Sequence, residues 1–237
     1  MPDHDALPGR LAAVRQQLAA AAHGVGRDPA MVTIIAVTKT LPPPVVEAVA
    51  AAGIADVGEN YVQEADEKRA RLSAAVRWHL IGGLQRNKVR TAARVFDCIH
   101  TIDRVELVRA LASEATGRPC PLPVLIQVNV SGESAKRGAS VEGAGAVVEA
   151  VLGTPHLRLD GLMTIGREGL PAATRAAFRT LRERRDDLAR RCGVELPHLS
   201  MGMSDDFVIA IEEGATLVRL GRVLLGARGV RPWREEA

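Results

Sequence analysis

A lysine follows the first strongly apolar segment of the chain. Five of the six residues 32–37 (VTIIAV) are β-branched, which favours a buried strand, and prolines at 42–44 end that strand and allow a helix to begin. Lys39 is therefore predicted at the mouth of a buried strand. Apolar surroundings favour the neutral form of a lysine, and a neutral amine can attack an aldehyde to form a Schiff base. The alternative is a lysine that ends a strand and reaches into solvent.

Two later segments carry the residue types that bind phosphate. In residues 200–207 (SMGMSDDF), Ser204 stands at the N-cap position of a predicted helix, whose free N–H groups attract an anion. In residues 218–223 (VRLGRV), Gly221 allows the backbone to approach a ligand closely, and Arg222 or its amide can contact the anion. A plain helix cap is the alternative for the serine.

Charged neighbours affect this interpretation. Asp205 and Asp206 oppose a phosphate at this position unless their side chains point away from it. Arg219 lies just before Gly221, where the alternative is a surface arginine at the end of a strand. A lysine able to form a Schiff base, two phosphate-type loops and an arginine between them together indicate pyridoxal 5′-phosphate (PLP) as the ligand.

Length and composition restrict the class of protein. The 237 residues are close to the roughly 250 typical of a (β/α)8 barrel, and 47% hydrophobic residues are enough for a large core. The net charge of +3 is mild and basic residues are interleaved with acidic ones, so nucleic acid is not expected as a partner. Three widely spaced cysteines, at 98, 120 and 192, offer neither metal-ligand spacing nor a disulfide framework. With no leader-like start and no membrane-spanning run, we expect a soluble cytoplasmic protein without a metal.

Strand-like and helix-like segments alternate along the whole chain. Eight segments are predicted as strands: 32–37, 54–58, 78–81, 98–102, 124–130, 157–164, 198–201 and 216–220. Helices are predicted at 5–23, 44–52, 61–75, 87–95, 104–116, 141–152, 172–192 and 205–213. This pattern predicts an α/β fold, a single (β/α)8 TIM barrel that occupies residues 1–237 as one domain, with the first helix as an extra element outside it.

The candidate site residues all lie at or shortly after the C-terminal ends of predicted strands. In (β/α)8 barrels the chemistry lies at the C-terminal ends of the strands, where loops from different parts of the chain meet. We therefore expect one site at this end, built from Lys39, Asn60, Met201, Ser204 and residues 219–222.

Several motifs occur in an order that resembles a known family. They are AVTKT (36–40), GENYVQE (58–64), WHLIG (78–82), LQRNK (84–88), GLMTI (161–165), SMGMSDD (200–206) and VRLG (218–221). The chain is identified by them as a member of the pyridoxal phosphate homeostasis proteins, relatives of the N-terminal barrel of alanine racemase. The resemblance covers nearly the whole chain.

The resemblance implies a role for each matching position. Lys39 is similar to the lysine that holds PLP as an aldimine, and Ser204, Gly221 and the backbone of Arg222 look like the phosphate ligands. Arg219 resembles the arginine that faces the pyridine nitrogen. Because an arginine stays charged, it would keep that nitrogen unprotonated and weaken the cofactor as an electron sink.

Other positions qualify the match. Leu41 and Pro42 stand where many members carry a second lysine or a histidine, and residues 224–226 read LLG where IFG is frequent. Lys136 matches a family lysine that could hold or pass on a second cofactor molecule, with a solvated loop lysine as the alternative. His79, inside a predicted strand, is interpreted as a core histidine with satisfied hydrogen bonds.

Two main functions are compatible with these residues. The first is a carrier without catalytic turnover that binds PLP reversibly and delivers it to PLP-dependent apo-enzymes. The alternative is a racemase of the alanine racemase type, which needs an acid or base on each face of the substrate. Alanine racemase takes one of these from a tyrosine in an added domain and partner subunit, whereas the only tyrosine here is Tyr61. A class I aldolase-like barrel fits less well, and without the added domain we expect a monomer.

Overall fold

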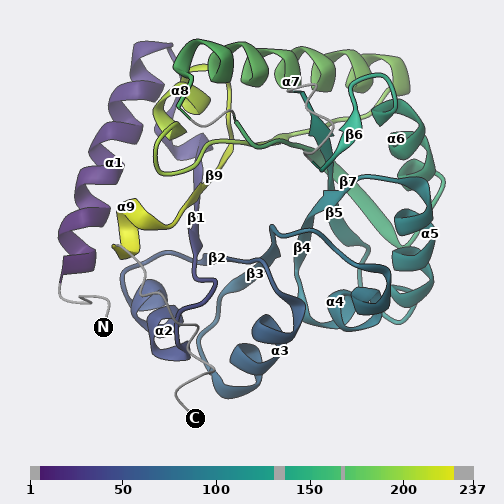
Figure 1. Cartoon of the computed structure of the whole chain (residues 1–237), viewed down its shortest axis with the longest axis horizontal. Coiled ribbons are helices and arrows are strands. Elements are labelled where there is room, and N and C mark those ends of the chain that lie inside the picture. The colour runs from purple at the N-terminus through teal and green to yellow at the C-terminus, as the bar shows by residue number, and fades with distance from the viewer. Residues whose placement is uncertain (1–5, 131–136, 167–168, 227–237) are drawn as a thin grey trace.

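The computed structural model describes residues 6–130, 137–166 and 169–226. Within these ranges eight parallel strands form a closed barrel (Figure 1). They follow the order β4-β3-β2-β1-β9-β8-β7-β5, and pairing of β4 with β5 closes the ring. The bounds are β1 Thr33–Val37, β2 Asp56–Glu59, β3 Arg77–Leu80, β4 Cys98–Ile102, β5 Leu122–Asn129, β7 Leu157–Met163, β8 His198–Ser200 and β9 Leu217–Leu220. The predicted (β/α)8 barrel is confirmed.

Helices surround the ring of strands (Figure 1). They are α1 Leu7–Gly24, α2 Pro43–Ala51, α3 Val62–Arg71, α4 Val89–Val95, α5 Val105–Glu114, α6 Ala144–Leu152, α7 Pro171–Cys192, α8 Phe207–Glu212 and α9 Arg222–Leu225. Helix α1 packs against α8 and α9 on the outside, as expected of an extra element. In the described part of the chain, no helix is both long and apolar enough to cross a membrane.

Side chains alternate between the barrel interior and the helix layer along each strand. A large apolar core lies between the strands and the helices. A smaller apolar group lies inside the barrel, formed by Ile35, Cys98, Leu125, Met163 and Leu217. Three buried polar residues, His79, His100 and Arg219, also come from strands and are described below. The barrel interior is therefore part apolar and part polar.

Two short elements were not expected from the sequence. Strand β6 (Ala139–Ser140) pairs with the end of β5, and α9 begins directly after Gly221. Helix α8 begins at Phe207, later than predicted, because residues 204–206 form a turn in which Asp206 Oδ1 accepts a hydrogen bond from the Met203 N–H at 2.5 Å. These differences change which atoms face the candidate site.

Candidate cofactor-binding site

A cavity of about 460 Å³ opens beside the C-terminal ends of β1 and β9. This volume is in the range of pockets that hold small molecules. Five of the predicted site residues line it: Lys39, Ser204, Arg219, Gly221 and Arg222. The remaining wall comes from Val37, residues 169–171 and Thr174 at the start of α7, Met203, Asp205, Asp206 and Ile209. The structure thus brings the lysine, the two loops and the arginine to one place.

Strand alternation explains why Lys39 reaches the cavity. Val37 is the last residue of β1 and also lines the cavity, and a position two residues further along an extended chain points the same way. Lys39 is half-buried. The next residue, Thr40, has φ +64°, an uncommon conformation for a β-branched residue, and its N–H donates to Glu64 Oε1 at 2.5 Å. The chain therefore turns sharply at this point and the turn is held from α3.

A buried ion cluster lies behind this turn. The fully buried Lys68 Nζ donates to Glu59 Oε1 at 2.7 Å, to Glu64 Oε1 at 2.6 Å and to the Thr38 carbonyl oxygen at 2.8 Å. An ammonium has three donors, so all are used. Thr38 Oγ1 also donates to Glu59 Oε1 at 2.7 Å. The cluster therefore fixes the backbone immediately before Lys39.

The pKa of Glu59 is raised in this cluster. Burial raises the pKa of Glu59 to about 7, against the lowering effect of Lys68. In the described part of the chain its second oxygen, Oε2, has no hydrogen-bond partner. Lys68 lies in the helix predicted at 61–75 and was not singled out from the sequence. The signal that the sequence offers is the i,i+4 spacing between Glu64 and Lys68. Glu59 belongs to the same motif (58–64) as Glu64.

Arg219 is part of β9 and its side chain lies inside the barrel. The residue is only 4% exposed, so the alternative of a surface arginine is wrong. Its Nη1 donates to Ser200 Oγ at 2.7 Å and its Nη2 to the Thr164 carbonyl oxygen at 2.8 Å. Burial lowers the pKa of Arg219 to about 10, and nearby Asp206 opposes this shift. The guanidinium therefore remains a cation at neutral pH and is held in a fixed orientation.

The two loops meet through Ser204. Its Oγ accepts a hydrogen bond from the Val223 N–H at 3.3 Å, so the hydroxyl faces the first turn of α9. The prediction that Ser204 is the N-cap of α8 is wrong, because Asp206 occupies that position. Both helices are short, six residues for α8 and four for α9, so individual N–H groups matter more than a helix dipole here. The hydroxyl and the amides after Gly221 form the polar end of the cavity.

The two acidic residues of this loop are already engaged. Asp205 pairs with Arg222 at the exposed rim, and Asp206 accepts the Met203 N–H described above. Burial raises the pKa of Asp206. The expected conflict with a phosphate is reduced, because one carboxylate is neutralised by an arginine and the other is turned back onto its own loop.

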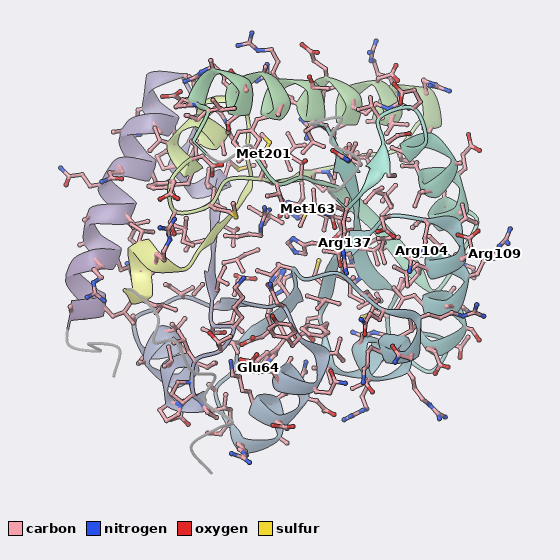
Figure 2. The ribbon with its side chains drawn as sticks, in the orientation of Figure 1. Glu64, Arg104, Arg109, Arg137, Met163 and Met201 are labelled. Carbon is pink, nitrogen blue, oxygen red and sulfur yellow. The ribbon has the colours of Figure 1, made fainter. Side chains whose placement is uncertain are left out.

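The structure does not place Asn60 and Met201 on the cavity wall. Met201 follows the inward-facing Ser200, so alternation directs it into the outer apolar core, where it is fully buried. Figure 2 shows Met163 near the barrel axis and Met201 nearer to α7 and α8. Asn60 is half-buried after β2, outside the cavity lining.

Two other residues named from the sequence, His79 and Tyr61, do not line the cavity in the described part of the chain. His79 is 2% exposed and both ring nitrogens have hydrogen-bond partners, which confirms it as a satisfied core histidine. Lys136 lies outside the described residues. Tyr61, the only tyrosine of the chain, is 56% exposed just before α3 and does not line the cavity.

The donor set fits an aromatic aldehyde that carries a phosphate. An amine lies on one wall, a buried cation lies inside the barrel, and the Ser204 hydroxyl with the backbone at Gly221 and Arg222 forms the polar end. The apolar wall of Leu170, Pro171 and Ile209 suits a flat ring. These features are the ones expected of a PLP-type site on a (β/α)8 barrel.

Comparison with known proteins agrees with this class. Residues 10–229 match the family profile of the alanine racemase N-terminal domain. The chain is 46% identical over 220 residues to the pyridoxal phosphate homeostasis protein of Pseudomonas aeruginosa, covering 92% of this chain and 94% of the relative. It is 41% identical over 221 residues to the protein of the same name from Aquifex aeolicus, covering 92% and 97%. The chain belongs to the pyridoxal phosphate homeostasis protein family.

A solved structure extends the match to three dimensions. The structure of PipY from Synechococcus elongatus with PLP bound has a TM-score of 0.83 against this chain at 34% identity, and the match covers 93% of this chain and all of that one.

Proposed function

We propose that this protein binds pyridoxal 5′-phosphate reversibly, takes part in intracellular vitamin B6 homeostasis and passes the cofactor to PLP-dependent apo-enzymes. The observation that carries the proposal is that Lys39, Arg219 and the Ser204–Arg222 loop pair line one cavity. The names of the relatives and the PLP bound to PipY support the choice of ligand.

Each wall of the cavity has a part in binding. Lys39 supplies the amine that bonds covalently to the cofactor aldehyde, and the Lys68 cluster holds that lysine's backbone in place. Ser204, with the amides that follow Gly221, binds the phosphate group. The residues at the start of α7 cover one side of the ring and exclude water from it.

Arg219 accounts for binding without turnover. When bound, PLP supplies an electron sink whose strength depends on protonation of its ring nitrogen. A guanidinium that stays charged does not donate its proton to that nitrogen and disfavours a second positive charge beside it. The protein therefore holds the cofactor in a form poorly suited to carbanion chemistry.

The racemase alternative needs a second acid or base, and among the described residues no tyrosine lines the cavity to supply it. Racemisation requires proton transfer on both faces of the substrate carbon. The only tyrosine of the chain, Tyr61, lies away from the cavity and more than half exposed. We therefore expect no racemisation of L-alanine or other amino acids above background, and a robust rate would contradict the carrier function.

Borohydride trapping tests the covalent link. PLP added to the protein should give an absorption band that borohydride makes permanent, and peptide mass spectrometry should place the label on Lys39. Lys39→Ala should lose the band, whereas Lys88→Ala is the matched control because Lys88 lies in the short turn before α4, outside the cavity. Retention of the band in Lys39→Ala would remove that lysine from the proposal.

Cofactor delivery needs a separate experiment. The PLP-loaded protein is mixed with a PLP-dependent apo-enzyme in the presence of an aldehyde trap that consumes free PLP. Activation of the apo-enzyme despite the trap supports direct transfer. Activation that disappears with the trap would limit the function to reversible storage.

A further inference from the structure

Five polar side chains form a continuous hydrogen-bonded row through the barrel interior. At one end, Asp56 Oδ1 lies 2.8 Å from His79 Nε2. His79 Nδ1 lies 2.9 Å from His100 Nε2, and His100 Nδ1 lies 2.9 Å from Ser200 Oγ. At the other end, Arg219 Nη1 donates to Ser200 Oγ at 2.7 Å. We call this row the interior relay.

The relay connects the candidate site to the opposite end of the barrel. Asp56 is the first residue of β2, and Lys39 follows the last residue of the adjacent parallel strand, so the two residues belong to opposite ends of the barrel. His100 and Ser200 are fully buried, and the other three members are no more than 8% exposed. The contacts cross from β2 through β3, β4 and β8 to β9, which joins segments distant in sequence.

When both histidine rings are neutral, the chemistry of the end groups fixes the direction of every proton in the relay. An ionised carboxylate only accepts, so His79 must donate to Asp56 from Nε2. In a neutral ring the other nitrogen then accepts, so His79 Nδ1 receives the proton of His100 Nε2.

The same argument continues to the arginine. His100 Nδ1 is then an acceptor, which requires the Ser200 hydroxyl to donate to it, while the same oxygen accepts from Arg219. Burial lowers the pKa of His100, in agreement with a neutral ring. All four hydrogen bonds therefore point the same way, from a cation to an anion, and such aligned bonds polarise and strengthen one another.

We propose that the interior relay couples the Asp56 carboxylate, which also lies 3.7 Å from Arg77 Nη1, to Arg219 and, through Ser200, sets the orientation and hydrogen-bonding strength of the guanidinium that faces the bound ring. This inference rests on the proposed function for its ligand, but the proton order of the relay is a property of the protein alone. Asp56, His79, His100 and Ser200 are positioning residues, because they act through Arg219 and do not line the cavity.

A buried metal ion is the competing explanation for the histidine pair. His79, Cys98 and His100 offer ligand atoms that all lie within 4.8 Å of one another. Zinc binds imidazole nitrogen at about 2.0–2.1 Å, and two nitrogens in a tetrahedral site lie roughly 3.3 Å apart. The 2.9 Å between His79 and His100 instead matches a hydrogen bond. Burial raises the pKa of the Cys98 thiol far above its usual range, which opposes the thiolate that zinc requires.

The ligand-free protein provides the first test. Nitrogen-15 NMR of labelled histidine should show His79 and His100 as neutral rings, both protonated on Nε2. Added zinc should leave these signals in place. A doubly protonated ring, a proton on Nδ1 of either ring, or a zinc-dependent change of both rings would overturn the relay.

The second test uses PLP carrying nitrogen-15 in its ring. Ser200→Ala removes the hydroxyl next to Arg219, and Asp56→Asn removes the negative charge at the far end. We expect both to displace the ring nitrogen signal, Ser200→Ala by more, and Ser200→Thr to restore it. The matched control is Thr101→Val, which removes a buried hydroxyl bonded to the Gly82 carbonyl outside the relay.

The outcomes separate the relay from the function. A signal that stays at the wild-type position in both variants would overturn the relay, even if both proteins were less stable. If Ser200→Ala does not fold, Asp56→Asn at the more accessible end gives the same comparison. If wild-type protein does not take up PLP, the proposed function fails, while the histidine signals of the ligand-free protein still decide the relay.

Discussion

Two buried cations, Lys68 behind the turn at Thr40 and Arg219 on the cavity wall, differ in the groups that surround their charge. Lys68 lies in the helix layer and meets two carboxylates directly, at 2.6 and 2.7 Å. Arg219 lies in the barrel interior and donates to a hydroxyl and a carbonyl oxygen, both neutral. Asp56, the carboxylate at the far end of the relay, is separated from Arg219 by the side chains of His79, His100 and Ser200.

This difference corresponds to two kinds of task. A cation paired directly with carboxylates has its charge compensated and its donors used, so it can hold a backbone turn but has little left for a ligand. A cation held by neutral acceptors keeps a field that a ligand experiences, at the cost of desolvation that lowers its pKa. We infer that Lys68 is structural and that Arg219 acts on the bound cofactor.

The largest expected effect is on stability, from Lys68→Met. Removing the cation leaves Glu59 and Glu64 buried without compensation, and breaking such a pair costs about 3–5 kcal/mol. Denaturant unfolding should measure this loss. Lys88→Met, outside the cluster, is the control and should change the unfolding free energy by less than about 0.5 kcal/mol. A loss from Lys68→Met as small as the control would contradict a structural role.

Arg219→Met should affect PLP binding more than stability, the reverse of what we expect for Lys68→Met. The two acceptors that lose their donor are neutral, so the expected loss of stability is about 1–3 kcal/mol, smaller than for Lys68→Met. The effect on bound PLP should be larger, with a displaced absorption band and weaker retention measured by dialysis. If the folded fractions of Lys68→Met and Arg219→Met lose PLP retention equally, the inference that Lys68 is structural and that Arg219 acts on the cofactor is wrong.

The contrast also shows what the sequence could reveal. The barrel followed from eight apolar strand segments, and Lys39, Ser204, Arg219 and Gly221 could be found because strand ends converge in such a barrel. Lys68 and the interior relay could not, because their partners are set by which strand faces which across the barrel. Asp56 and Arg219 are far apart in sequence, and only the closed ring brings their hydrogen-bonded row together. Met201 was expected at the site because its position after a strand was known but its face was not.

A smaller effect should separate phosphate binding from ring binding. Gly221 has φ −111°, outside the left-handed region that favours glycine, and it lines the cavity, so Gly221→Val should place a side chain in the polar end of the cavity. We expect roughly tenfold weaker retention of pyridoxal 5′-phosphate, or about 1.4 kcal/mol, with little change for pyridoxal, which lacks the phosphate. Titration of both ligands measures this ratio. Equal losses would place the phosphate elsewhere and would leave Arg219 as the main anchor.

The smallest expected effect concerns the pH dependence of the Lys68 cluster. The pKa of Glu59 rises from 4.5 to about 7 on folding, so the folded state holds more protons than the unfolded state between these values. The contribution of Glu59 to stability is therefore fully present below pH 4.5 and is lost as the pH rises through about 7.

Glu59→Gln should remove this loss. The difference in unfolding free energy between wild type and Glu59→Gln should shift by about 1 kcal/mol or more between pH 5 and 7, in favour of the variant at the higher pH. Glu106→Gln, on the exposed surface of α5, is the matched control and should give a difference that does not change with pH. A constant difference for Glu59→Gln would mean that Lys68 fully compensates the carboxylate, which would make the contrast with Arg219 sharper still.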